Sequence, residues 1–315
     1  MDLAQALRAA LGEDRVRRDA PLAPCTTFRI GGPADVLAEV RSAEEALVAL
    51  RLAREAGVPL TWLGGGSNVL VGDGGVRGLV VRWHGGSVET VAPDRVRAEA
   101  GVTVNGLVRY TIGHGLAGLA EWAGTPGTVG GAVRGNAHFQ GRLLSESVVS
   151  VDVAAPDGAV RTLDAGDMDF GYDRSRLQRT REVALRASFR VVPGDANALR
   201  AVARASLAFR KRTQPLALPS AGCVFQNPDP ASVTLPEGVP FSAGALVDLV
   251  GLKGASCGGA RVSTVHANFV VNEGGATARD VAALVDRMRD AVAARFGVVL
   301  EEEIVRLGEF VSWPA

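Results

Sequence analysis

The stretch Leu63-Gly64-Gly65-Gly66-Ser67-Asn68-Val69-Leu70-Val71 contains the strongest structural signal in the chain. An apolar run at 59–63 leads into three consecutive glycines, and a second apolar run follows Asn68. A strand that ends in glycines exposes backbone N–H groups with no Cβ in the way. Successive exposed N–H groups form a nest that suits a phosphate or pyrophosphate, and Ser67 and Asn68 add side-chain donors. The alternative is a tight turn between two strands, which this stretch alone does not exclude.

Length and composition indicate a globular protein of two or three domains. The 315 residues are enough to bury a sizeable core. The 34 basic and 34 acidic residues balance, so we expect no nucleic-acid partner and no membrane insertion. The 39 glycines cluster between apolar runs, which favours defined backbone turns over disorder.

The cysteines and the first residues give expectations about metals and location. Cys25, Cys223 and Cys257 are odd in number and far apart, which argues against a disulfide framework or a zinc site. We therefore expect no bound metal. Residues 1–8 have neither the basic start nor the apolar core of a signal peptide, and no apolar stretch approaches a membrane span. We expect a cytoplasmic protein.

Alternation and capping signals predict an α+β fold. Capping boxes, Ser42 with Glu45 and Thr277 with Asp280, begin two of the expected helices. Pro193-Gly194 is the best candidate boundary between domains. The expected helices cover 2–11, 43–56, 104–112, 196–210, 243–250 and 278–296. The expected strands include 34–40, 78–83, 148–154, 159–163, 182–192, 266–272 and 298–307.

A second glycine-rich stretch, Gly124-Thr125-Pro126-Gly127-Thr128-Val129-Gly130-Gly131-Ala132, offers another nest. Two nests suggest a long ligand with a pyrophosphate in its middle, and a dinucleotide fits that description. Neither stretch is the GxGxxG fingerprint that opens a helix, and no GxxxxGK[ST] occurs. The residues therefore predict a phosphate-rich cofactor in a scaffold other than the Rossmann fold.

Six motifs occur in an order that resembles the UDP-N-acetylenolpyruvoylglucosamine reductase family, also called UDP-N-acetylmuramate dehydrogenases. The resemblance covers residues 25–308. The motifs are Thr27-Phe28-Arg29-Ile30-Gly31-Gly32, the two glycine stretches, Ala221-Gly222-Cys223-Val224-Phe225-Gln226-Asn227-Pro228, His266-Ala267-Asn268-Phe269 and Leu300-Glu301-Glu302-Glu303.

The resemblance implies a flavin enzyme of peptidoglycan precursor synthesis. NADPH would pass a hydride to bound FAD, which would then reduce UDP-N-acetylglucosamine enolpyruvate to UDP-N-acetylmuramate. The implied fold is a two-subdomain FAD-binding domain of the vanillyl-alcohol-oxidase type, with a C-terminal α+β substrate-binding domain. The expected boundaries are 1–85 and 86–194 for the subdomains, 195–297 for the UDP-sugar domain, and 298–315 for a strand that carries the catalytic glutamate.

Three catalytic residues follow from the resemblance. Cys223 stands where the family usually has a serine, and its thiol would protonate the substrate carbon. Glu303 matches the family's catalytic glutamate. The family pattern Tyr-Arg-x-Ser is altered here, because Asp173 occupies the arginine position and Arg174 comes one residue later. Arg174 is the best candidate for the missing cation, with a surface ion pair as the alternative.

Binding residues are implied in the same way. The expected cofactor-binding residues are Arg29, Gly64, Gly65, Gly66, Ser67, Asn68, Gly124, Thr125, Pro126, Gly127, Thr128, Gly130, Gly131, Ala132 and Asn136. The expected substrate-binding residues are Tyr172, Arg210, Gln226, Asn227 and Lys253.

Two other functions fit the same patterns. One is an FAD-dependent oxidase of an alcohol or sugar acid on the same flavin fold, for which a covalently tethered flavin would be evidence. The other is a flavin-free protein that binds a nucleotide sugar, for which a colourless protein that cannot be reconstituted with FAD would be evidence.

Overall fold

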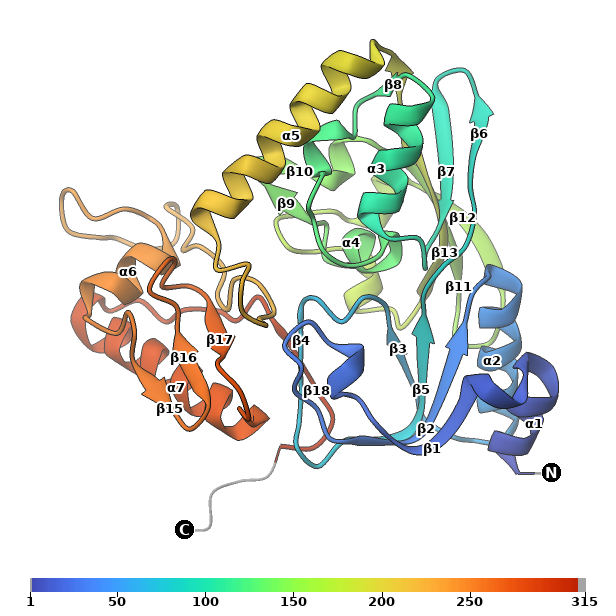
Figure 1. Ribbon diagram of the computed structural model, residues 1–315, viewed down its shortest axis with the longest axis horizontal. Coiled ribbons are helices and arrows are strands. Elements are labelled where there is room, and N and C mark those ends of the chain that lie inside the picture. Colours follow the sequence, from blue (N-terminus) through green and yellow to red (C-terminus); the bar gives the residue numbers. More distant parts are fainter. Residues whose placement is uncertain (1, 311–315) are drawn as a thin grey trace. The chain divides into compact units, whose positions relative to one another are not determined.

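The computed structural model describes residues 2–310 and divides the chain into two compact units. Unit 1 consists of Met1–Ala20, Ala34–Gly65 and Arg77–Phe209. Unit 2 consists of Pro21–Pro33, Gly66–Val76 and Arg210–Ala315, so two short N-terminal segments belong with the last third of the chain (Figure 1). The expected division into four segments stays a prediction.

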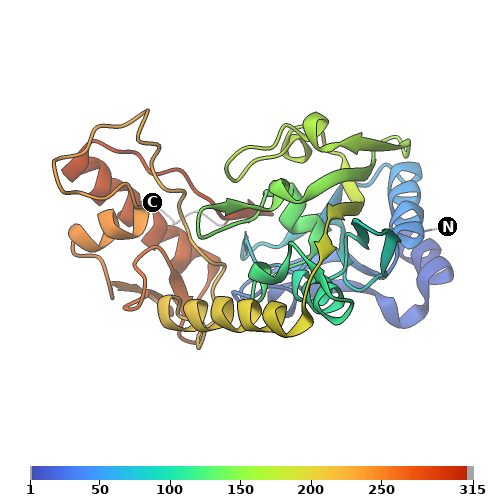
Figure 2. The ribbon, with the colours of Figure 1, turned by 90° about the horizontal axis from the view of Figure 1, so that it is seen from above.

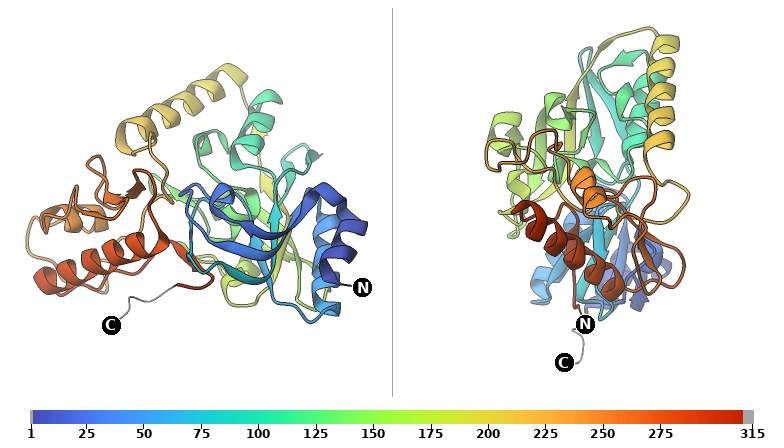
Figure 3. Two further views of the ribbon diagram at one scale, coloured as in Figure 1. Left: turned by 60° about the horizontal axis from the view of Figure 1, so that its bottom comes forward. Right: turned by 90° about the vertical axis from the view of Figure 1, so that its left-hand side faces the viewer.

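The first sheet of unit 1 has four strands in the order β1-β2-β5-β3. Its strands are β1 (Val16–Pro21), β2 (Pro33–Val40), β3 (Leu60–Leu63) and β5 (Val76–Trp83). Strands β3 and β5 pair in parallel, which brings the end of β3 and the glycines after it to one edge of the sheet. Helices α1 (Leu3–Leu11) and α2 (Ala43–Glu55) lie side by side (Figures 1 and 3). Ser42 caps α2 as predicted, because its Oγ accepts a hydrogen bond from the Glu45 N–H at 3.2 Å.

The second sheet of unit 1 has five antiparallel strands in the order β12-β11-β13-β7-β6. The predicted hairpin at 148–163 is confirmed as β11 and β12. The strands are β6 (Val88–Ala92), β7 (Arg95–Glu99), β11 (Val148–Ala154), β12 (Val160–Asp164) and β13 (Val183–Arg190). Short pairs are β8 (Leu116–Ala117) with β14 (Val192–Pro193) and β9 (His138–Phe139) with β10 (Arg142–Leu143).

Helices α3 (Val104–Gly113) and α4 (Val129–Arg134) pack in unit 1, and α4 contacts β13 and β7. Thr103 caps α3, because its Oγ1 accepts a hydrogen bond from the Gly106 N–H at 2.9 Å. A long helix, α5 (Ala196–Thr213), follows β14. Single 3-10 turns occupy Glu13–Arg15, Ala23–Cys25, Ala120–Trp122, Leu144–Glu146, Ala165–Met168 and Arg176–Gln178.

Unit 2 has its own core, with Phe225, Leu246 and Met288 fully buried. Helices α6 (Ala243–Leu249) and α7 (Ala278–Phe296) lie side by side (Figures 1 and 2). They accompany a small antiparallel sheet of β15 (Ser256–Cys257), β16 (Ala260–Val262) and β17 (Val270–Asn272). Strand β4 (Val69–Val71) pairs in parallel with β18 (Val305–Leu307). The capping box of Thr277 and Asp280 begins α7 as predicted.

Two strand predictions in unit 2 are wrong over most of their length. Only Val305–Leu307 of the strand predicted at 298–307 lies in a ladder, and Glu302 forms an isolated bridge with Phe225. The alternation expected for Glu301, Glu302 and Glu303 in a regular strand therefore does not apply. Only Val270–Asn272 of the strand predicted at 266–272 is regular, because Ser263 and His266 side chains accept backbone hydrogen bonds and form a turn there.

The architecture confirms the α+β class. Among the residues that the structure describes, no helix has both the length and the apolar character needed to cross a bilayer. The features that concern function are the glycine turns of unit 1 and the extended segments of unit 2 around Cys223.

Candidate functional site

The two glycine stretches predicted as separate nests meet in unit 1. A Cβ on Gly64 would lie 2.4 Å from Thr128 Oγ1, and a Cβ on Gly65 would lie 2.6 Å from the Gly127 Cα. Both distances are too short for any side chain, because Gly64 packs directly against the Thr128 side chain and the Gly65 backbone packs directly on the Gly127 backbone. Gly127 also has a φ of +96°, a region that residues with a side chain rarely adopt.

Backbone donors remain at the point where the loops meet. The N–H groups of Val129 and Gly130 are used inside unit 1, since they donate to Val102 and Ala100 carbonyls at 2.8 Å each. Among residues 2–310, by contrast, the N–H groups of Gly65 and Gly127 donate to no other residue. A cradle of glycines with spare backbone donors is the arrangement that binds phosphate oxygens. The residues present therefore fit the pyrophosphate of a dinucleotide such as FAD.

The second loop is held by a residue that the sequence did not single out. Asn105 Oδ1 accepts a hydrogen bond from the Gly124 N–H at 2.7 Å, and its Nδ2 donates to the Thr125 carbonyl at 3.2 Å. Asn136 supports the far end of the loop, because its Oδ1 accepts from the Ser145 N–H at 2.9 Å and its Nδ2 donates to the Gly171 carbonyl at 2.8 Å. The Asn136 side chain is therefore used in folding this segment.

The rest of the first stretch packs inside unit 2. Gly66 has a φ of +61°, and a Cβ there would lie 2.2 Å from the Cys25 carbonyl oxygen. Asn68 Nδ2 donates to the Glu303 carbonyl at 3.0 Å, and the Val305 N–H donates to the Asn68 carbonyl at 2.9 Å. Asn68, the residue before β4, thus fixes the backbone at Glu303.

The Cys223 segment runs between two other extended segments of unit 2. On one side the Val224 N–H donates to the Asn268 carbonyl at 2.7 Å. On the other side the Glu303 N–H donates to the Val224 carbonyl at 2.8 Å. This arrangement brings the predicted thiol and the predicted carboxylate onto adjacent backbone segments, although 80 residues separate them in the sequence (303 minus 223).

The surroundings of Cys223 keep its proton on sulfur. Burial and the Glu303 carboxylate raise the pKa of the Cys223 thiol to about 12, while a hydrogen bond from the Asn268 side chain opposes this rise. Both main causes disfavour the negatively charged thiolate. At neutral pH the group is therefore a thiol that can donate a proton.

The family arginine position falls at the tip of a tight turn in unit 1. Gly171 and Arg174 pair backbone to backbone at 3.0 and 3.2 Å, which places Tyr172 and Asp173 at the tip. Asp173 has a φ of +51°, a conformation that aspartate tolerates better than most residues. Arg174 lies at the base of the turn, is largely exposed, and faces the Asp169 carboxylate at 4.0 Å.

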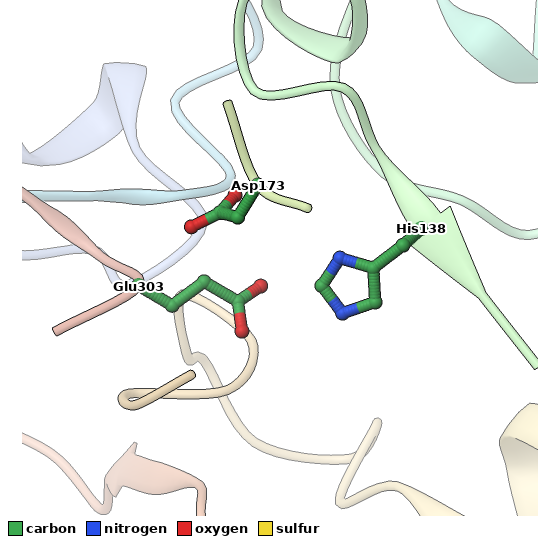
Figure 4. Close-up of side chains that lie close together, drawn as sticks. All are labelled: His138, Asp173 and Glu303. Atoms are coloured by element: carbon green, nitrogen blue, oxygen red, sulfur yellow. The ribbon is translucent and has the colours of Figure 1, made fainter. Parts of the chain in front are cut away.

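Two further polar side chains gather beside Asp173. A His138 ring nitrogen and an Asp173 carboxylate oxygen lie within 4.8 Å of each other, and Figure 4 shows both side chains. Partial burial lowers the pKa of His138. The centres of the His138 and Tyr172 rings lie 4.6 Å apart. Arg134 is exposed overall. Even so, desolvation lowers the pKa of its guanidinium, and the Asp173 carboxylate, which acts in the opposite direction, offsets this only in part. Sequence reasoning missed Arg134, because nothing in the pattern of α4 connects it to residue 173.

The remaining predicted substrate residues have individual surroundings. Arg210 is buried, and burial lowers the pKa of its guanidinium to about 10, which leaves it charged at neutral pH. Asn227 Oδ1 accepts from the Ala243 N–H at 3.0 Å at the start of α6. Lys253 pairs with Asp248 at 2.9 Å on the surface. The Gln226 backbone N–H donates to the Glu301 carbonyl at 2.9 Å.

Comparison with known families and proteins agrees along most of the chain. Residues 34–164 match the model of the FAD binding domain. Residues 214–307 match the model described as UDP-N-acetylenolpyruvoylglucosamine reductase, C-terminal domain.

The relatives that are similar to this chain over nearly its whole length include two proteins with the same name. A UDP-N-acetylenolpyruvoylglucosamine reductase of Myxococcus xanthus is 43% identical over 307 residues, which cover 96% of this chain and 95% of that protein. One from Moorella thermoacetica is 43% identical over 295 residues and covers 94% of both chains. The crystal structure of UDP-N-acetylenolpyruvylglucosamine reductase from Thermus caldophilus superimposes with a TM-score of 0.77 at 33% identity, covering 93% of this chain and 99% of that one.

Proposed function

Because the chain belongs to the UDP-N-acetylenolpyruvoylglucosamine reductase family, it is an oxidoreductase, and we propose that it reduces UDP-N-acetylglucosamine enolpyruvate to UDP-N-acetylmuramate. The proposal includes NADPH as the hydride donor, bound FAD, and a role in peptidoglycan precursor synthesis in the cytoplasm. The observation that supports it most is that the segment of Cys223 is hydrogen-bonded to that of Glu303, whose carboxylate helps to raise the pKa of the thiol.

The reaction sets two demands on the protein. Hydride addition to one carbon of the enolpyruvyl group places negative charge on the neighbouring carbon and its carboxylate. Catalysis then needs a donor that protonates that carbon, and polar or cationic groups that stabilise the developing charge. When bound, FAD supplies the two-electron hydride transfer between NADPH and the substrate.

Cys223 meets the first demand. Its raised pKa means that sulfur carries a proton at neutral pH, so the thiol is ready to donate. In the proposed step the S–H bond breaks, a C–H bond forms on the substrate, and sulfur keeps the electron pair as a thiolate. Water then restores the thiol. The shift also predicts that the thiolate is short-lived, because burial and Glu303 both disfavour it.

Glu303 and Arg174 are proposed for the second demand. The Glu303 backbone is fixed by Asn68 and Val224, so its side chain starts from a defined position. Arg174 is the cation assigned to the enolate, and this role requires its guanidinium to exchange the Asp169 carboxylate for the substrate. Tyr172, at the tip of the same turn, is proposed to contact the substrate.

Binding roles follow the same units. We assign FAD to the glycine loops, where Gly65 and Gly127 keep spare N–H groups. The other expected cofactor residues, from Arg29 to Asn136, stay proposals. For the UDP-sugar we keep Gln226, Asn227, Lys253 and Arg210, of which Arg210 carries the least hydrated charge because it is buried.

An anaerobic flavin spectrum tests this function. The purified protein, reconstituted with FAD, should show an oxidised flavin band that NADPH bleaches and that the enolpyruvyl UDP-sugar restores without oxygen. The product should have the mass of UDP-N-acetylmuramate. A flavin that NADPH reduces but that only oxygen re-oxidises would contradict the proposal, and so would a protein that binds no FAD.

A further inference from the structure

Asn268 lies in the turn before β17 and is almost fully buried, with 2% of its surface exposed. Both ends of its amide contact the backbone of Phe225. Its Oδ1 accepts from the Phe225 N–H at 3.0 Å, and its Nδ2 donates to the Phe225 carbonyl at 2.7 Å. Together with the bond from the Val224 N–H to the Asn268 carbonyl, three hydrogen bonds fix the two residues that follow Cys223.

The same amide reaches the sulfur. The Asn268 side chain forms a hydrogen bond with the Cys223 side chain, and this bond favours the charged form of the thiol. After its bond to the Phe225 carbonyl, the Asn268 Nδ2 group still has a second hydrogen that it can donate to sulfur. Cys223 also pairs with Phe269 in an isolated bridge. The turn that contains Asn268 and Phe269 therefore holds Cys223 as well as the two residues that follow it.

We propose that Asn268 is a positioning residue for Cys223, which holds the sulfur as an acceptor so that the S–H proton points away from the amide and toward the substrate carbon. The proposal rests on the proposed function, in which Cys223 is the proton donor. When the S–H bond breaks and the C–H bond forms, the Nδ2–H group stabilises the electron pair left on sulfur. Hydrogen bonds to charged groups are stronger than those to neutral ones, so the stabilisation is greatest after proton transfer.

A second buried asparagine provides the matched control. Asn272 lies in β17 with 7% of its surface exposed. Its Nδ2 donates to the Phe28 carbonyl at 3.0 Å, and its Oδ1 accepts from Gly274 and Ala276 N–H groups at 2.9 and 3.2 Å. It has the burial and backbone bonding of Asn268, but its amide serves Phe28 and the loop before α7 instead of Phe225 and Cys223.

The test separates the two half-reactions in the FAD-loaded protein. Asn268→Ala should leave the rate at which NADPH reduces the flavin unchanged, and should slow re-oxidation by the enolpyruvyl UDP-sugar by about ten- to a hundredfold. Asn272→Ala should destabilise the protein without this selective loss. Equal losses in both half-reactions, or the same selective loss in Asn272→Ala, would overturn the proposal.

A double-mutant cycle shows whether Asn268 acts through sulfur. In a Cys223→Ala background, Asn268→Ala should have no further effect on re-oxidation by the substrate, because no thiol remains to be positioned. An equal fold-loss in both backgrounds would show a purely structural role and contradict the proposal.

A third readout does not depend on the reaction. Asn268→Asp keeps the acceptor for the Phe225 N–H but loses the Nδ2–H donor, so Cys223 should be alkylated more slowly by iodoacetamide at pH 9, as followed by mass spectrometry. Asn272→Asp should alkylate at the wild-type rate. An unchanged Cys223 rate in Asn268→Asp would contradict the positioning role. This result stands even if the wild-type protein fails to reduce the enolpyruvyl UDP-sugar, which would count against the proposed function alone.

Discussion

The side chain of Asn68, in the first glycine-rich stretch, donates a 3.0 Å hydrogen bond to the backbone carbonyl of Glu303. The two residues are 235 positions apart in the sequence. The Val305 N–H donates a hydrogen bond to the Asn68 carbonyl at 2.9 Å, so the segment that carries Glu303 is attached to Asn68 on both sides of residue 304. A stretch expected only to bind a cofactor thus also positions a proposed catalytic carboxylate.

Asn68→Ala tests this attachment. Loss of one hydrogen bond should lower the free energy of unfolding by about 1 kcal/mol, and the displaced Glu303 should slow re-oxidation of the flavin by the substrate. Urea unfolding and stopped-flow absorbance measure the two effects. Asn197→Ala, an exposed asparagine on α5, should match the wild type in both measurements. Wild-type stability together with wild-type re-oxidation in Asn68→Ala would contradict the account.

The raised pKa of Cys223 predicts a pH dependence of stability. Burial and the Glu303 carboxylate raise the pKa of the thiol to about 12 in the folded protein, against the ordinary cysteine value of 9.0. Below pH 9 both states keep the proton, so its contribution to stability is fully present. Above pH 9 the unfolded chain loses its proton first, and stability falls as the pH rises toward 12.

Cys223→Ser removes this group from the titration. The wild type should lose about 1 kcal/mol of unfolding free energy relative to Cys223→Ser between pH 7.5 and pH 10, as measured by urea unfolding at each pH. Comparison of the two proteins at the same pH cancels the other groups that titrate in this range. A difference between the proteins that stays constant from pH 7.5 to pH 10 would show that the thiol is not shifted.

Gly65→Ala tests the cradle. The new Cβ would lie 2.6 Å from the Gly127 Cα, so one of the two loops must move. We expect FAD to bind about ten- to a hundredfold more weakly, since forcing atoms into a packed contact typically costs 1–3 kcal/mol. Titration of the apoprotein with FAD measures the Kd. Gly113→Ala at the end of α3, where a Cβ meets nothing within 4 Å, should bind FAD as the wild type does.

Arg174→Ala tests the proposed cation. If this guanidinium stabilises the enolate, kcat should fall at least about tenfold, which corresponds to the loss of 1.4 kcal/mol from the transition state. Arg179→Ala is the control, because Arg179 pairs with the same Asp169 carboxylate on the surface and has no proposed role in the reaction. Near-wild-type turnover of Arg174→Ala would remove Arg174 from the site and leave Arg134, beside Asp173, as the next cation to change.

Local signals predicted much of the fold, and tertiary contacts decided the rest. The caps at Ser42, Thr103 and Thr277 were predictable because each side chain bonds a backbone N–H three residues away. Of the strand expected at 298–307, only Val305–Leu307 is regular, because the one backbone bridge of the preceding part joins Glu302 to Phe225, which lies far away in the sequence. Alternation shows that a segment is extended, but it does not show whether a partner strand lies beside it.

In the candidate site, too, local sequence signals predicted one part and tertiary contacts decided the other. The glycine stretches could be found from composition, yet their meeting at Gly65 and Gly127 depends on a contact between distant loops. Cys223 and Glu303 were identified through a family resemblance. Asn268 was in one of the motifs, but its role depends on bonds to Phe225, 43 residues earlier, and to the sulfur of Cys223.

A single-turnover experiment on three proteins tests the central claim most directly, namely that the Cys223 thiol protonates the substrate carbon. Wild type, Cys223→Ser and Cys223→Ala are loaded with FAD, reduced anaerobically with one equivalent of NADPH, and mixed with the enolpyruvyl UDP-sugar. All three should accept hydride from NADPH, but only wild type and Cys223→Ser should regain the oxidised flavin band and release product quickly. Re-oxidation of Cys223→Ala by the substrate at the wild-type rate would contradict the account.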